Sequence, residues 1–180
     1  MDYKMIENYI THFPIYQYAF LKPEAVEFSD KVRTICKKEC SRYGRSWSCP
    51  PAVGSVAKCR ERCLGYTDVL FFSSVAEVSD IYNMEEVLKT RVEHELYTSK
   101  IEEFLREQGF LVYTLSTESC AICEKCAYPR KSCRHPEQMH PCIESHGILV
   151  TKTIEDNKMD YYMGEKIVLW YTMMFFREHK

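Results

Sequence analysis

Three of the 10 cysteines in this sequence stand at a spacing that suits metal binding. In the stretch CAICEKC, two residues separate Cys120 from Cys123 and two separate Cys123 from Cys126, and Cys133 follows in the same segment. A zinc site usually draws its four ligands from two separated pairs. A CxxCxxC loop instead suits three corners of an iron-sulfur cubane, with a more distant cysteine on the fourth iron. We therefore predict a [4Fe-4S] cluster at Cys120, Cys123, Cys126 and Cys133, with zinc as the alternative.

The first cysteine segment, residues 36–63, offers five further thiols: Cys36, Cys40, Cys49, Cys59 and Cys63. Pro50 and Pro51 keep the chain after Cys49 extended and out of a helix, so we expect this thiol to be presented and not packed. A helix predicted for residues 56–64 puts Cys59 and Cys63 on one face, and either could complete a four-thiol site. We predict a second [4Fe-4S] cluster here, with zinc as its main competitor. Cys142 stands alone and is interpreted as structural.

Charge is distributed unevenly around these cysteines. Residues 31–62 and 120–134 together hold 13 basic and 3 acidic residues, a formal charge of +10, whereas the whole chain has a charge of −2. The basic residues are Lys31, Arg33, Lys37, Lys38, Arg42, Arg45, Lys58, Arg60, Arg62, Lys125, Arg130, Lys131 and Arg134. Cations beside thiolates would lower the thiol pKa and offset the charge of a four-thiolate site. The alternative is a solvated basic face that meets nucleic acid.

Composition and length place limits on the class of protein. A chain of 180 residues with 46% hydrophobic content suits one cysteine-rich domain over residues 1–180. The N-terminus lacks the basic start, apolar run and cleavage site of a secretory signal. The longest apolar run, residues 167–176, is about half of what a membrane-spanning helix needs. We expect a cytoplasmic protein with reduced thiols and no membrane contact.

The periodicity of apolar residues and the positions of capping and turn residues predict an α+β fold with a mixed sheet. Asn83 and Glu86 resemble a capping box at the start of a long helix, and a β-α-β unit is predicted over about residues 68–116. The expected strands lie within residues 25–36, 67–75, 110–116, 148–153 and 166–176. The expected helices cover residues 56–64, 84–108 and about 137–146. In the second of them, apolar residues recur at the spacing of one helix face: Val87, Leu88, Val92, Leu96, Ile101, Phe104 and Leu105.

Three stretches together resemble a known family: YGRSWSCPPAVG, CAICEKCAYPRKSCRHPEQ and HPCIESHGILV. The sequence is similar, from about Val32 to its C-terminus, to the uncharacterised bacterial and archaeal predicted metal-binding proteins of domain-of-unknown-function family 2284. The resemblance implies metal binding, iron-sulfur in type, and no settled reaction. Position 142 is usually not a cysteine in that family, which agrees with a structural interpretation of Cys142.

Three function classes follow from these residues. The first is electron transfer through two clusters to or from a redox partner protein. The second is an enzyme that acts on a small-molecule substrate at an iron held by only three cysteines. The third is a zinc-stabilised module for nucleic acid or another anionic partner, although nucleic acid is the less favoured partner. His135, His140 and His146 are interpreted as supporting or surface residues. The sequence contains no motif of a nucleotide-driven or hydrolytic enzyme.

Overall fold

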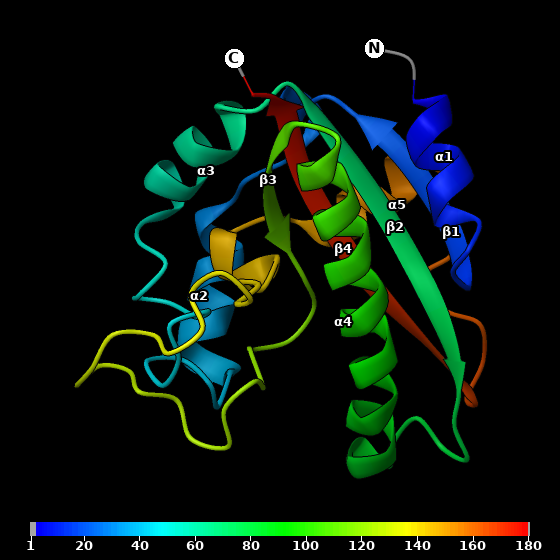
Figure 1. Cartoon of the computed structure of the whole chain (residues 1–180). Helices are drawn as coiled ribbons and strands as arrows, with labels where there is room; N and C mark the ends of the chain where they lie inside the picture. Colours follow the sequence, from blue (N-terminus) through cyan, green and yellow to red (C-terminus); the bar gives the residue numbers. More distant parts are fainter. Residues whose placement is uncertain (1–2, 180) are drawn as a thin grey trace.

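A four-stranded antiparallel sheet forms the centre of the computed structural model, which describes residues 3–179 (Figure 1). The strands are β1 (Ile15–Leu21), β2 (Asp68–Glu77), β3 (Phe110–Leu115) and β4 (Ile167–Glu178), in the spatial order β1-β2-β4-β3. This confirms the α+β class. The sheet is not mixed as predicted, because every strand pair is antiparallel.

The predicted β-α-β unit is present in a split form. Helix α4 (Met84–Glu107) connects β2 to β3. These two strands run parallel because each pairs antiparallel with β4, which lies between them. Local sequence patterns find the two strands and the helix, but the insertion of the C-terminal strand depends on contacts that are distant along the chain.

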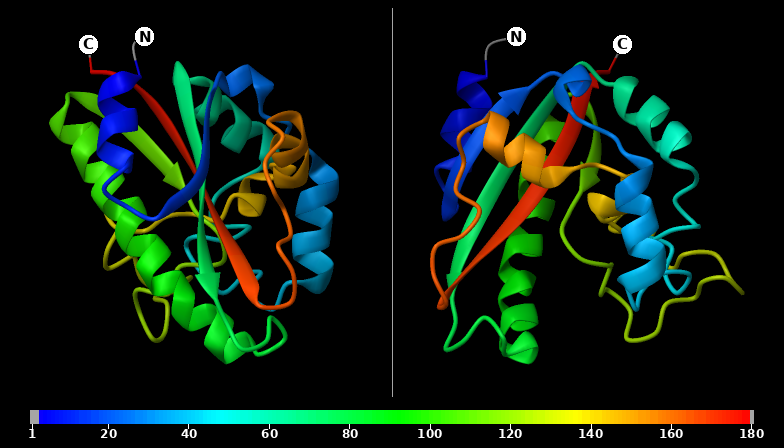
Figure 2. Two further views of the ribbon diagram at one scale, coloured as in Figure 1. Left: turned by 90° about the vertical axis from the view of Figure 1, so that its right-hand side faces the viewer. Right: turned by 180° about the vertical axis from the view of Figure 1, so that it is seen from behind.

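The two faces of the sheet carry separate hydrophobic clusters, because successive strand residues point to opposite sides. Leu70 and Phe72 of β2 pack against α4 and against α1 (Lys4–Ile10). Val69 and Phe71 point the other way, toward α3 (Val56–Leu64), η2 (Glu144–His146) and α5 (Val150–Asp156). Helix α2 (Asp30–Glu39) and the 3-10 turn η1 (Pro23–Ala25) lie on that second side (Figure 2). The first cysteine segment, which contains the end of α2 and all of α3, therefore lies on that second side.

Three predicted elements near the cysteines are wrong. Residues 25–36 form no strand; instead Ser29 caps α2 by accepting a hydrogen bond from Lys31 N at 3.3 Å, with Asp30 in the first turn. Residues 148–153 enter α5 and not a strand, and the helix expected over 137–146 is reduced to η2. The helix at 56–64 is confirmed, with Ser55 as its N-cap and Gly65 as its C-cap. Within residues 3–179, no helix is long and apolar enough to cross a membrane.

The long helix α4 is confirmed, but its predicted apolar face is partly wrong. Leu88, Val92 and Leu96 are exposed. Between the buried Val87 and Ile101, the buried positions of the helix are polar, namely Arg91, His94 and Thr98. His94 bonds Ser74 Oγ on β2 at 2.7 Å through Nδ1 and Thr172 Oγ1 on β4 at 2.8 Å through Nε2. A hydrogen-bonded cluster thus joins α4 to the sheet where apolar packing was expected.

This cluster predicts acid sensitivity. Burial lowers the pKa of His94 to about 4 from 6.5. Between these two pKa values His94 is protonated in the unfolded chain but neutral in the folded chain. The stability that is present above pH 6.5 is therefore lost as the pH falls toward 4. The expected contribution is roughly 3 kcal/mol. Urea unfolding of the wild type and of His94→Gln between pH 7 and 4 would measure it, with the variant showing the flatter curve. The exposed His12→Gln is the control, and identical slopes for all three proteins would refute the assignment.

Gly147 ends η2 where this turn meets α2 and α3. Its φ of 79° is left-handed, and an added Cβ would lie 2.8 Å from Val56 Cγ2 and 3.1 Å from Ser29 O. Gly147→Ala is therefore expected to lower the free energy of unfolding by roughly 2–4 kcal/mol, through backbone strain and overpacking together.

The matched control is Gly109→Ala. Gly109 has a φ of 85°, but nothing lies within 4 Å of its added Cβ. It should therefore lose only the strain, about 1 kcal/mol. Denaturant unfolding measures both variants, and equal losses would show that the close approach to α3 contributes nothing.

Candidate metal centres

Four thiols surround one cavity of about 450 Å³ on the α2 side of the sheet. Cys36 lies in the last turns of α2 and Cys40 is its C-cap. Cys49 follows in the loop before α3 and lines the same cavity, but it is buried, so the expectation that this thiol is not packed is wrong. The fourth thiol is Cys142, which comes from the segment just before η2. These four residues form the first set.

Cys142 is held beside the first segment by its backbone and its side chain. Its N–H donates to Ser48 O at 3.3 Å, and it makes a parallel bridge with Ser116 at the end of β3. Its Sγ donates to Glu144 Oε2 at 2.8 Å. Burial and the neighbouring carboxylate raise the pKa of the Cys142 thiol well above its ordinary value. The thiol interpreted as structural from the sequence therefore faces the same cavity as three predicted ligands.

Cys59 and Cys63 lie elsewhere, in contrast to the expectation that one of them completes the first site. They share the buried face of α3 as predicted, and both are completely buried. Cys63 packs in the hydrophobic cluster with Val69 and Phe71, and burial raises its pKa to about 12. Cys59 Sγ contacts Val53 O at 3.4 Å. Neither lines the cavity of the first set, because this face of α3 points into the core.

The second set consists of Cys120, Cys123, Cys126 and Cys133, which line a cavity of about 20 Å³. The structure thus brings together the four cysteines predicted for this site. Trp47 and His135 line the same cavity. Trp47 donates from Nε1 to Lys131 O at 3.0 Å, which ties the turn of the first segment to the second segment.

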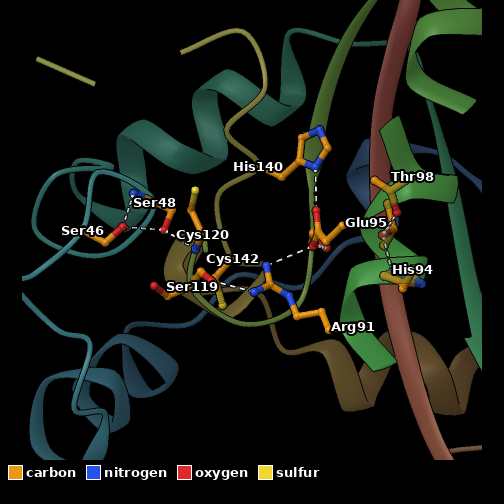
Figure 3. A network of polar contacts seen from close by, with 12 residues as sticks. Ser46, Ser48, Arg91, His94, Glu95, Thr98, Ser119, Cys120, His140 and Cys142 are labelled. Carbon is orange, nitrogen blue, oxygen red and sulfur yellow. Dashed lines mark hydrogen bonds and ion pairs between the residues drawn. The ribbon is translucent and has the colours of Figure 1, made fainter. Parts of the chain in front are cut away.

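Two buried serines connect the two sets (Figure 3). Ser48 Oγ accepts a hydrogen bond from Cys120 N at 2.9 Å and lies 3.7 Å from Cys49 Sγ. It also lies 2.9 Å from Ser46 Oγ, and the Ser46 hydroxyl bonds Cys126. One short hydrogen-bonded path therefore runs from the first set to the second. No sequence motif predicts this path, because the two serines lie in the turn SWSC, which matches no known pattern.

The basic residues do not control the thiols in the predicted way. Burial raises the pKa of Cys36, of Cys49 and of Cys120 despite nearby arginines. The pKa of Cys126 is lowered, because hydrogen bonds from the backbone of Tyr128 and Trp47 and from Ser46 outweigh its burial. With the exception of the half-buried Arg33, the 13 basic side chains are exposed.

A charged network lies behind the second set. His140 contacts Glu95 Oε2 at 3.0 Å and Glu102 Oε2 at 2.7 Å. Burial alone would lower the pKa of His140, but these two hydrogen bonds raise it to about 9. Arg91 bonds both Glu95 and the carbonyl of Ser119, next to Cys120 (Figure 3).

No sequence motif predicts this charged network. Its one signal is the seven-residue spacing of Glu95 and Glu102, which puts two carboxylates on one face of α4. His140 serves as a supporting residue, as interpreted, and it lines neither four-thiol cavity. His146 is also supporting, since it is buried and bonds Tyr113 Oη at 2.6 Å. His135 lies on the surface beside the second set.

The donor atoms of both sets suit a thiolate-bound metal centre. All 10 cysteines are free thiols. Zinc and iron-sulfur clusters both take cysteine sulfur, and each cavity presents four such atoms. In the described part of the chain, no group of three or more His, Cys, Asp or Glu side chains is arranged to hold a single metal ion.

Two sets of four thiols beside an α+β sheet define a cysteine-rich metal-binding protein. A family model matches residues 19–176. The chain belongs to this family, which is described as predicted metal-binding protein (DUF2284). The resemblance seen in the sequence motifs is thereby confirmed. No curated protein and no solved structure matches the chain.

Proposed function

We propose that this protein binds two [4Fe-4S] clusters and transfers electrons to or from a partner. Cys120, Cys123, Cys126 and Cys133 would hold one cluster, and Cys36, Cys40, Cys49 and Cys142 the other. The observation that carries the proposal is the presence of two four-thiol cavities whose walls are joined by Ser48. The CxxCxxC spacing of the second set favours a cubane over zinc.

Residues around the two sets would determine which of the two clusters has the higher reduction potential and therefore holds the electron. Bound clusters of this kind supply one-electron chemistry at a potential set by charge, hydrogen bonds and exposure. The hydroxyl of Ser48 contacts Cys49 Sγ. Cys126 Sγ receives hydrogen bonds from backbone N–H groups and from the Ser46 hydroxyl. Such bonds stabilise negative charge on sulfur. The two sets therefore differ in environment, since Cys49 is buried whereas Cys126 is partly exposed.

The exposed basic residues favour a second candidate, a module that binds nucleic acid or another polyanion. Arg45, Lys125 and Arg134 separate the two functions because they are exposed and lie close to proposed ligands. Arg134 Nη1 donates to Lys125 O at 3.0 Å, which keeps this cation beside the loop of the second set.

We expect Arg45→Gln, Lys125→Gln and Arg134→Gln each to lower a reduction potential, because the reduced centre loses a positive neighbour. Voltammetry of the anaerobic protein measures this shift, with Lys58→Gln on α3 as the control. Nucleic-acid affinity should be weak in all four variants. Unchanged potentials, combined with binding whose salt dependence falls by roughly one unit of slope per variant, would instead support the polyanion-binding function.

A further inference from the structure

A second kind of site lies at the free edge of the sheet, beside strand β3. A cavity of about 480 Å³ opens between α3, β3, the C-terminal end of α4 and the second cysteine segment. Its volume is in the range of small-molecule sites, which are roughly 300–1,000 Å³. None of the predicted ligands lines it except Cys133.

The walls of this cavity are mainly apolar and partly aromatic. Val53, Val112, Met139 and Pro141 contribute aliphatic surface, and Trp47 contributes its ring. The indole is fixed, because its Nε1 donates to Lys131 O at 3.0 Å. A flat apolar group would therefore meet a rigid surface with little loss of side-chain entropy.

Arg62, at the end of α3, supplies the cavity with a charge that no protein group neutralises. It donates from Nη1 to Tyr113 Oη at 3.0 Å, and its guanidinium carbon lies 5.4 Å from the Tyr113 ring centroid. Tyr113 in turn bonds the buried His146 at 2.6 Å. Among residues 3–179, no carboxylate makes a salt bridge with Arg62. The guanidinium is thus held in place by neutral groups and keeps its remaining donors for a ligand.

The acidic residues of the lining are less available to a ligand. Glu102 pairs with Arg106, and its other oxygen lies 2.7 Å from His140 Nε2. Glu137 is exposed on the rim, where water screens its charge. The strongest unpaired polar group of the cavity is therefore a cation beside apolar walls.

We propose that this cavity binds an organic anion with a flat apolar body, whose phosphate or carboxylate group pairs with Arg62. The ring would lie against Trp47 and Met139, and this places it next to Cys133 of the second set. This site goes beyond the proposed electron transfer, and its occupation does not depend on which metal the cysteines hold.

Calorimetric titration of the metal-loaded full chain, carried out anaerobically, tests the proposal. The probe is 1-naphthyl phosphate, with 2-naphthoate as the carboxylate form. We expect one saturable site per chain for at least one of these two anions. The neutral 1-naphthol and inorganic phosphate, which each lack one half of the ligand, should bind at least roughly tenfold more weakly.

Two variants and a matched control locate the site. Arg62→Gln should weaken the binding roughly tenfold or more, since it removes the charge-assisted contact. Ala52→Glu should weaken the binding similarly, because it keeps Arg62 but places a negative charge in the cavity wall, which repels the anion. Arg60→Gln, exposed on the same helix and absent from the lining, should change the affinity by less than about twofold. Absence of saturable binding to both anions would overturn the proposal, as would equal losses in Arg60→Gln and Arg62→Gln, which would indicate diffuse attraction to the basic face.

Discussion

Replacing Cys142 with serine is expected to remove about half of the bound iron. Cys142 faces the cavity of Cys36, Cys40 and Cys49, so its loss leaves one iron of the first cluster without a thiolate. The second set should retain its cluster, because Cys142 does not line the cavity of that set. Iron and acid-labile sulfide in the anaerobically purified variant measure the effect.

The controls for this variant are Cys59→Ala and Cys63→Ala. Both thiols are completely buried on α3, away from the cavity. Each variant should keep the full iron content and lose only about 1 kcal/mol of stability, because a buried sulfur is replaced by a methyl group. Loss of iron in either control, with none in Cys142→Ser, would show that α3 supplies the fourth ligand.

Replacing Cys123 with serine is expected to remove the other half of the iron. Cys123 is the middle cysteine of CxxCxxC, and it lines one small cavity together with the three other thiols of the second set. Because metal binding and folding are coupled, the variant should also unfold at a lower temperature. The double variant Cys123→Ser/Cys142→Ser should retain almost no iron.

Ser132→Ala is the matched control for the second set. Ser132 is exposed and directly precedes Cys133, but it supplies no thiol. Its iron content should equal that of the wild type. If Cys123→Ser kept its full iron content, or lost all of its iron, the proposal of two independent centres would be contradicted.

The second set was accessible to sequence analysis because its information is local. Cys120, Cys123 and Cys126 lie within one loop, so their spacing already limits the geometry. The first set is different, since Cys142 is far along the chain from Cys49. The two meet only because the segment before η2 runs beside Ser48 and the end of β3. No local pattern contains that contact.

The same distinction explains the outcome for the fold. Helix α3 was predicted correctly because Ser55 and Gly65 mark both of its ends. Residues 25–36 were predicted to include a strand, although Ser29 is a typical N-cap residue and caps helix α2 in the structure. The buried polar face of α4 was missed because His94 finds its partners on β2 and β4. A prediction from apolar periodicity alone places polar residues such as His94 on the solvent-exposed face of the helix.

We propose that eight of the cysteines hold two iron-sulfur clusters. Elemental analysis of the anaerobically purified wild-type protein tests it most directly, with iron, acid-labile sulfide and zinc measured on the same sample. The proposed ligands predict about eight irons and about eight sulfides per chain, with little zinc. One or two zinc ions per chain without iron or sulfide would contradict the claim.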